Sequence, residues 1–262
     1  MKIKLSQCTL AYDDAGSGTP ILFIHGYPMN RKLWNGQITA LAEASRVLTL
    51  DLRGHGDSEQ TPGPYSMELF ADDCKEFLDA LGIQKAVICG LSMGGYVCMA
   101  FYRKYAARVA GIVLTATRPA ADSPAARENR DIAIHQVTTQ GPTPIVEGMV
   151  ERLLSPYSLA NHPEMVEKTR LMMEGISTQT IVADLRGLKA RRDSTDLLPH
   201  ITVPVCIIHG EDDRIVPVSE AHEMQKAIRQ SRIHVFAHAG HVPNLEQTAL
   251  FNQTVHQFLS AL

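Results

Sequence analysis

The chain has 262 residues, of which 45% are hydrophobic and 20% are charged, and its formal net charge is −3. This length and composition fit one large α/β domain with room for an insertion. The small negative charge and the lack of a basic stripe exclude nucleic acid as an expected partner. The opening residues lack the apolar core of a signal peptide, and no apolar run reaches membrane-spanning length.

Five cysteines are an odd number, and none lies in a CxxC or zinc-type spacing. Cys89 and Cys206 lie inside apolar runs, where cysteine behaves as a small hydrophobic residue. Reduced thiols are therefore expected. We predict a cytoplasmic protein with no membrane partner, and the sequence leaves its oligomeric state open.

Short apolar runs alternate with amphipathic stretches through the first 115 residues. The predicted strands cover residues 3–6, 9–14, 21–24, 46–50, 86–89 and 109–115. Helices are predicted from about residue 30, over 66–81 and over 96–105. This alternation predicts βαβ units and a mainly parallel sheet covered on both faces.

The alternation stops between Arg118 and Pro199, where the chain is polar, helical in character and interrupted by prolines. We interpret residues 118–199 as a helical cap insertion over the strand ends, between two core segments, 1–117 and 200–262. The alternation resumes with predicted strands at 205–209 and 232–236 and predicted helices at 218–230 and 243–262.

A Gly-x-Ser-x-Gly motif, Gly90-Leu-Ser92-Met-Gly94, joins a predicted buried strand to a predicted helix. In this context a sharp turn lifts Ser92 above the strand end, where a base can remove its proton. Gly90 and Gly94 leave room for the strand and the helix to approach each other. The helix N-terminus adds N–H groups near any anion that forms at the serine. Taken alone, the motif equally fits a glycine-rich turn with an incidental serine.

Two further polar groups follow predicted strands near the C-terminus. Asp213 lies in an acidic run after the strand at 205–209, and His241 follows the strand at 232–236. Separately, these fit a solvated acidic loop and a surface histidine. Together with Ser92 they give the order serine, acid, histidine, with each group directly after a strand and therefore at one edge of the sheet.

At this point the sequence resembles the α/β-hydrolase superfamily over nearly its full length. The resemblance rests on four motifs, His25-Gly-Tyr-Pro28, Asp51-x-Arg-Gly-His-Gly-x-Ser58, Gly90-x-Ser-x-Gly-Gly95 and Gly240-His241. It implies the α/β-hydrolase fold, in which a mostly parallel central sheet is flanked by helices and carries a helical cap.

The resemblance also implies a catalytic triad. Ser92 is the expected nucleophile, His241 the general base, and Asp213 the acid that orients the histidine. Members of the family place this acid three residues after a glycine and ahead of Val-Pro, which selects Asp213 over its acidic neighbours. Asp122 is the carboxylate nearest to the alternative acid position, after the strand at 109–115.

The expected oxyanion hole consists of the backbone amides of Met93 and Tyr27. Tyr27, Trp34 and Arg118 are the candidate substrate-binding residues. Trp34 also fits the core, and Arg118 fits a solvated arginine better than a binding residue. If Arg118 does bind substrate, a carboxylate is the group it would hold.

The implied reaction is hydrolysis of a small carboxylic ester or lactone through an acyl-serine, with no metal or other cofactor. The chain looks most like small carboxylesterases, 3-oxoadipate enol-lactonases and cofactor-free haloperoxidases. Perhydrolysis or carbon–carbon bond cleavage with the same triad remains an alternative, as does a slow-turnover ligand receptor. The expected partner is a small-molecule ester or lactone.

Overall fold

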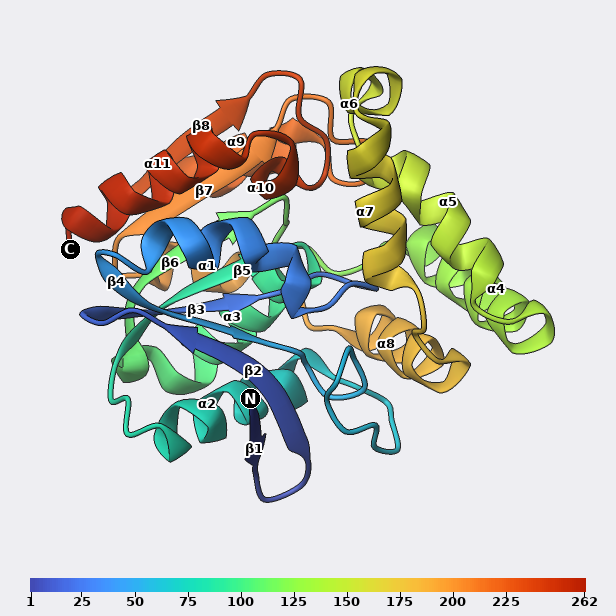
Figure 1. The fold of residues 1–262 in the computed structure, drawn as a ribbon, viewed down its shortest axis with the longest axis horizontal. Helices are drawn as coiled ribbons and strands as arrows, with labels where there is room; N and C mark the ends of the chain where they lie inside the picture. The colour runs from blue at the N-terminus through green and yellow to red at the C-terminus, as the bar shows by residue number, and fades with distance from the viewer.

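The computed structural model describes all 262 residues and contains one eight-stranded sheet, in the order β1-β2-β4-β3-β5-β6-β7-β8 (Figure 1). The strands are β1 (Lys2–Lys4), β2 (Thr9–Ala15), β3 (Thr19–Ile24), β4 (Ser45–Leu50), β5 (Ala86–Leu91), β6 (Val109–Thr115), β7 (Val205–Gly210) and β8 (Ser231–Phe236). The β1–β2 and β2–β4 pairs are antiparallel, and every pair from β4 to β8 in this order is parallel. The predicted mostly parallel sheet is confirmed.

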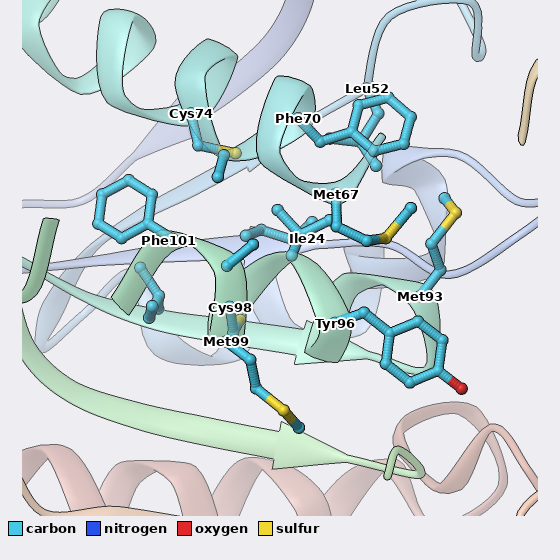
Figure 2. Packing of buried hydrophobic residues seen from close by; sticks show 14 of the residues in the cluster. Ile24, Leu52, Met67, Phe70, Cys74, Met93, Tyr96, Cys98, Met99 and Phe101 are labelled. Carbon is cyan, nitrogen blue, oxygen red and sulfur yellow. The ribbon is translucent and has the colours of Figure 1, made fainter. Parts of the chain in front are cut away.

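Alternating side chains of β3 enter two separate hydrophobic clusters, because successive residues of a strand point to opposite faces. Ile21 and Phe23 pack with Trp34 on one face. Leu22 and Ile24 belong to the cluster on the other face, where Figure 2 shows Ile24 among side chains from the helices above it. The first face is covered by α1 (Asn35–Leu41) and α11 (Thr248–Ser260), and the second by α2 (Met67–Ala80), α3 (Met93–Tyr105) and α9 (Val218–Ala227).

Only helices occupy the segment between β6 and β7, and they gather at one end of the sheet (Figure 1). They are α4 (Pro124–Gln140), α5 (Thr143–Leu153), α6 (Pro156–Asn161), α7 (Pro163–Met173), α8 (Thr178–Ala190) and the 3₁₀ helix Thr195–His200. The hydroxyls of Ser123, Ser155 and Ser177 accept N–H groups in the first turns of α4, α6 and α8, which is how serine caps a helix. No helix in the structure combines the length and the apolar character needed to cross a bilayer.

Some boundaries differ from the sequence prediction. The expected helix over 243–262 is two helices, α10 (Pro243–Glu246) and α11, because Gln247 leaves the helical conformation at φ −125° and ψ 51°. The Gln247 side chain donates to the carbonyl of Ala237, which anchors the break. The helix expected from about residue 30 begins as a 3₁₀ turn, Arg31–Trp34, capped by the Asn30 side chain.

Candidate active site

Ser92 lies at the sharp turn between β5 and α3 and has a positive φ of 55°. Such a conformation is uncommon for a residue with a side chain and persists only where the surroundings hold it. The Ser92 amide donates to the Thr115 carbonyl at 2.9 Å, and the Ser92 carbonyl accepts from the Thr117 hydroxyl at 2.9 Å. The end of β6 therefore fixes the turn on both sides of the serine.

Two glycines make this turn possible. A Cβ atom on Gly90 would lie 2.2 Å from the carbonyl oxygen of Gly94. One on Gly94 would lie 2.2 Å from the carbonyl oxygen of Ile24. Because no side chain fits at either place, the glycines allow the start of α3 to pack against the ends of β5 and β3.

Asp213 and His241 are in direct contact, with 2.7 Å between Asp213 Oδ2 and His241 Nδ1. Both side chains are buried. Asp213 Oδ1 accepts from the amides of Ile215 at 2.8 Å and Val216 at 2.9 Å. Burial alone would raise the pKa of Asp213, but the facing His241 and these hydrogen bonds outweigh burial and hold that pKa well below its usual range. The carboxylate is therefore ionised and acts as an acceptor for the histidine.

A second histidine, His209, contacts the same carboxylate. Its Nε2 atom lies 3.3 Å from Asp213 Oδ2 and 2.8 Å from the Val216 carbonyl oxygen. Since a carbonyl can only accept, Nε2 carries the proton and faces both oxygens. From the sequence, His209 is only the last residue of a predicted strand, and no spacing pattern distinguishes it from an ordinary core residue.

The loop that carries His241 is tied to the helical segment between β6 and β7. The His241 amide donates to the Leu153 carbonyl at 2.8 Å. Glu246 accepts from the amides of Ser155 at 2.7 Å and Gly240 at 2.5 Å. One carboxylate thus joins the histidine loop to the start of α6. The sequence shows Glu246 five residues after His241, but no pattern there indicates these two hydrogen bonds.

Most of the predicted site residues line one cavity of about 550 Å³ between the strand ends and helices α4, α5 and α8. Its walls include Tyr27, Ser92, Met93, Arg118 and His241. Asp213 is not in the wall, but its carboxylate contacts three residues that are, His241, Ile215 and Val216. A cavity of this size, with a few converging polar groups, is typical of a small-molecule site.

Trp34 does not belong to this cavity, so its expected substrate contact is wrong. The indole is fully buried and packs against Phe23, with ring centroids 4.8 Å apart, and against Phe251 at 6.0 Å. The helical spacing that placed Trp34 on an apolar face was a core signal, because α1 covers the sheet at this point.

Tyr27 and Met93, the two residues predicted to supply an oxyanion hole, both line the cavity. Tyr27 follows β3 in the loop next to the turn, and Met93 is the first residue of α3. Amides in the first turn of a helix have no partner within that helix, so the start of α3 presents donors beside Ser92.

Asp122, the alternative acid, lies in the cavity wall but is bound by arginines. Arg191 Nη1 approaches Asp122 Oδ1 at 2.5 Å, Arg130 Nε approaches Oδ2 at 3.1 Å, and Arg118 Nη2 approaches Oδ1 at 3.3 Å. Burial would raise the pKa of Asp122, but the Arg191 hydrogen bond and the nearby guanidinium charges lower it overall. Of these two acids, Asp213 is the one in contact with His241.

Comparison with known proteins identifies relatives along the whole chain. The profile of the alpha/beta hydrolase fold family matches residues 19–248. The structure superposes with a TM-score of 0.97 on a thermophilic esterase from Thermogutta terrifontis with malate bound, at 39% identity over 100% of this chain and 98% of that one.

Two further relatives are named for activities other than esterase. The enol-lactonase from Burkholderia xenovorans LB400 has a TM-score of 0.92 at 26% identity, over 99% of this chain and 100% of that one. A non-heme haloperoxidase of Rhodococcus erythropolis is 29% identical over 88% of each chain.

Proposed function

The chain belongs to the α/β-hydrolase family, and from this premise we propose that it is a serine hydrolase that cleaves a small carboxylic ester or lactone. The observation that carries the proposal is the 2.7 Å contact between Asp213 and His241 at a cavity that also exposes Ser92 on its strained turn. The names of the esterase and enol-lactonase relatives support the reaction class.

The proposed mechanism follows from the hydrogen bond at His241. Because an ionised carboxylate only accepts, His241 Nδ1 donates to Asp213, and Nε2 is the basic nitrogen of the neutral ring. Nε2 takes the Ser92 proton as the serine oxygen attacks the substrate carbonyl carbon. Asp213 stabilises the imidazolium that results.

The attack converts the carbonyl oxygen into an oxyanion, which we place at the backbone amides of Met93 and Tyr27. When the tetrahedral intermediate collapses, the bond to the leaving oxygen breaks and His241 returns its proton to that oxygen. Water then attacks the acyl-serine by the same route and releases the acid and free Ser92. Every proton and electron pair is accounted for by these residues, the substrate and water.

We assign substrate selection to the helical cap, residues 118–199. Helices α4, α5 and α8 supply much of the cavity wall, including Ile132, Ile145, Met149 and Leu185. These apolar side chains suit a small organic acyl or alcohol group. The expected partner is accordingly a small-molecule ester or lactone.

The proposal is tested with p-nitrophenyl esters from acetate to decanoate, on the wild type and on Ser92→Ala protein. We expect turnover that peaks at short acyl chains, because the cavity is small, and that is lost in the variant. Ser260→Ala serves as the control, since that exposed hydroxyl bonds only within its own helix. Turnover that survives in Ser92→Ala, or that is lacking in the wild type, would contradict the proposal.

A second candidate reaction is favoured by the haloperoxidase relative. Hydrogen peroxide can replace water at the acyl-serine, giving a peracid and free Ser92. Peroxide-dependent halogenation of a reporter in acetate buffer would measure it. If this rate exceeds ester hydrolysis, the perhydrolase assignment replaces the hydrolase one.

A further inference from the structure

The carbonyl oxygen of Ser92 accepts three hydrogen bonds, although a carbonyl has only two lone pairs. The amides of Gly95 and Tyr96, in the first turn of α3, donate to it at 2.9 and 3.3 Å. These two bonds are the ones that a helix makes to the residue before its first turn. The third donor is the Thr117 hydroxyl, at 2.9 Å, and it comes from outside the helix. The helix alone does not require this third bond.

Thr117 reaches Ser92 because the chain turns sharply after β6. Ala116 has a positive φ of 46°, which is uncommon for a residue with a side chain. Its amide donates to the Ile208 carbonyl of β7 at 3.0 Å, and both Ala116 and Thr117 are fully buried. Backbone of this kind persists only where the surroundings enforce it, and it is concentrated at functional sites. The turn therefore places the Thr117 side chain at the start of α3.

The third glycine of the motif, Gly95, makes room for this threonine. A Cβ atom on Gly95 would lie 2.5 Å from Thr117 Oγ1 and 2.6 Å from both Thr117 Cβ and Thr117 Cγ2. These distances are too short for any side chain at residue 95. Gly95 therefore serves a purpose separate from that of Gly90 and Gly94: it lets Thr117 pack against the first turn of α3.

The bond from Thr117 also fixes the direction of the Met93 amide. The Ser92 carbonyl and the Met93 N–H belong to one peptide unit, which is not among the cis bonds of the chain. In a planar trans unit these two groups point in opposite directions, so donors that hold the oxygen also hold the N–H. Met93 is the first residue of α3, and its amide has no partner within that helix. It is also one of the two donors that we place at the oxyanion.

We propose that Thr117 is a positioning residue for the oxyanion hole. Its hydroxyl holds the Ser92–Met93 peptide so that the Met93 amide already points at the oxyanion site before the substrate arrives. Thr117 does not line the cavity, so it acts through the backbone and touches no reacting atom. Donors fixed in advance stabilise the transition state because they need no reorientation as charge develops. This inference rests on the proposed serine-hydrolase function and adds a positioning residue to it.

The test compares p-nitrophenyl butyrate with its thionoester, in which sulfur replaces the carbonyl oxygen. Sulfur accepts hydrogen bonds poorly, so the ratio of the two kcat/KM values, each divided by the rate with hydroxide, measures the contribution of the oxyanion hole. We expect a wild-type ratio of at least about 100, the effect of one oxyanion donor.

Thr117→Val has nearly the same shape and lacks only the hydroxyl. It should lower kcat for the ester about tenfold with little change in KM, and should lower the ester-to-thionoester ratio about fivefold, in the range for a neutral hydrogen bond. Thr117→Ser keeps the hydroxyl and should keep most of both values.

Thr254→Val is the matched control, since Thr254 is also buried and its hydroxyl donates to a backbone carbonyl, that of Leu250, at 2.8 Å. Its kinetics should equal those of the wild type. A Thr117→Val protein with an unchanged ratio, or one that loses activity equally on both substrates, would overturn the inference while leaving Ser92-dependent hydrolysis intact. A wild type without preference for the ester would overturn it as well. If the wild type hydrolyses neither substrate, the serine-hydrolase proposal fails and this inference fails with it.

Discussion

At the scale of single residues, Asp213 is the acid that the proposed mechanism depends on. It contacts His241 at 2.7 Å, whereas its neighbour Asp212 has no side-chain hydrogen bond or ion pair. Asp213→Asn should therefore lower kcat by about 10⁴, since the amide favours the wrong histidine tautomer. Asp212→Asn should change kcat less than about threefold. Steady-state kinetics on both proteins decide the matter, and a larger loss in Asp212→Asn would refute the acid assignment.

The pH dependence follows from the lowered pKa of Asp213. Folding lowers the pKa of this carboxyl below its ordinary value near 4. Its ionised form therefore stabilises the fold at any pH above about 4, and this stability is lost as the pH falls through the folded-state pKa. The acid limb of kcat/KM should therefore come from protonation of the histidine base and not of Asp213. A rate that stays flat down to pH 4 would argue against a histidine base.

Sequence patterns located some site residues and not others. Ser92, Asp213 and His241 could be selected because each follows a strand and because their order matches a known motif; their catalytic roles stay predictions. His209 could not be selected, since its contact with Asp213 depends on how the loop after β7 folds back. Trp34 was ambiguous, because the core and a pocket wall share one apolar pattern.

At the scale of elements, Glu246 joins the histidine loop to the helical cap through two backbone amides. Glutamine offers one acceptor oxygen in place of two, so Glu246→Gln should leave one amide unpaired and loosen the His241 loop. We expect kcat to fall about tenfold with little change in KM, because His241 is displaced while the substrate wall is kept. Stopped-flow or steady-state ester hydrolysis measures both constants.

Glu211→Gln is the control for this experiment. Glu211 is exposed in the adjacent loop after β7 and makes no side-chain hydrogen bond or ion pair. It should behave as the wild type. A Glu246→Gln protein with wild-type kcat would show that the two hydrogen bonds of Glu246 do not position the histidine.

The elements of the sheet were predictable because fully apolar runs such as Ile21–Ile24 are long enough for a buried strand and too short for a helix. The break between α10 and α11 was not predictable, because Gln247 is held by the distant Ala237 carbonyl rather than by a glycine or proline. Local sequence fixes the start of α4, α6 and α8 through serine caps. The cavity beside Ser92, walled by α4, α5 and α8, depends on packing between segments far apart in the chain.

At the scale of the whole molecule, stability should depend on a buried ion pair that anchors the loop after β4. Arg53 donates twice to Asp73 of α2, at 2.6 and 2.5 Å, and both side chains are buried. Asp73→Asn leaves the Arg53 charge without its partner and should reduce the free energy of unfolding by about 3–5 kcal/mol. Urea denaturation provides the measurement.

Asp72→Asn is the neighbouring control. Asp72 contacts Lys104 and Tyr105 at the surface, where a pair contributes up to about 1 kcal/mol. If both substitutions cost the same small amount, the buried pair does not anchor the loop as described.

The most direct test of Ser92 as the nucleophile is to treat the protein with a fluorophosphonate and locate the adduct by peptide mass spectrometry. An activated serine reacts, because the phosphonyl group is attacked as a substrate carbonyl would be, and fluoride leaves. We expect one adduct on Ser92, formed at least about 100-fold more slowly in His241→Ala protein. No adduct, an adduct on another serine, or equal labelling without His241 would contradict it.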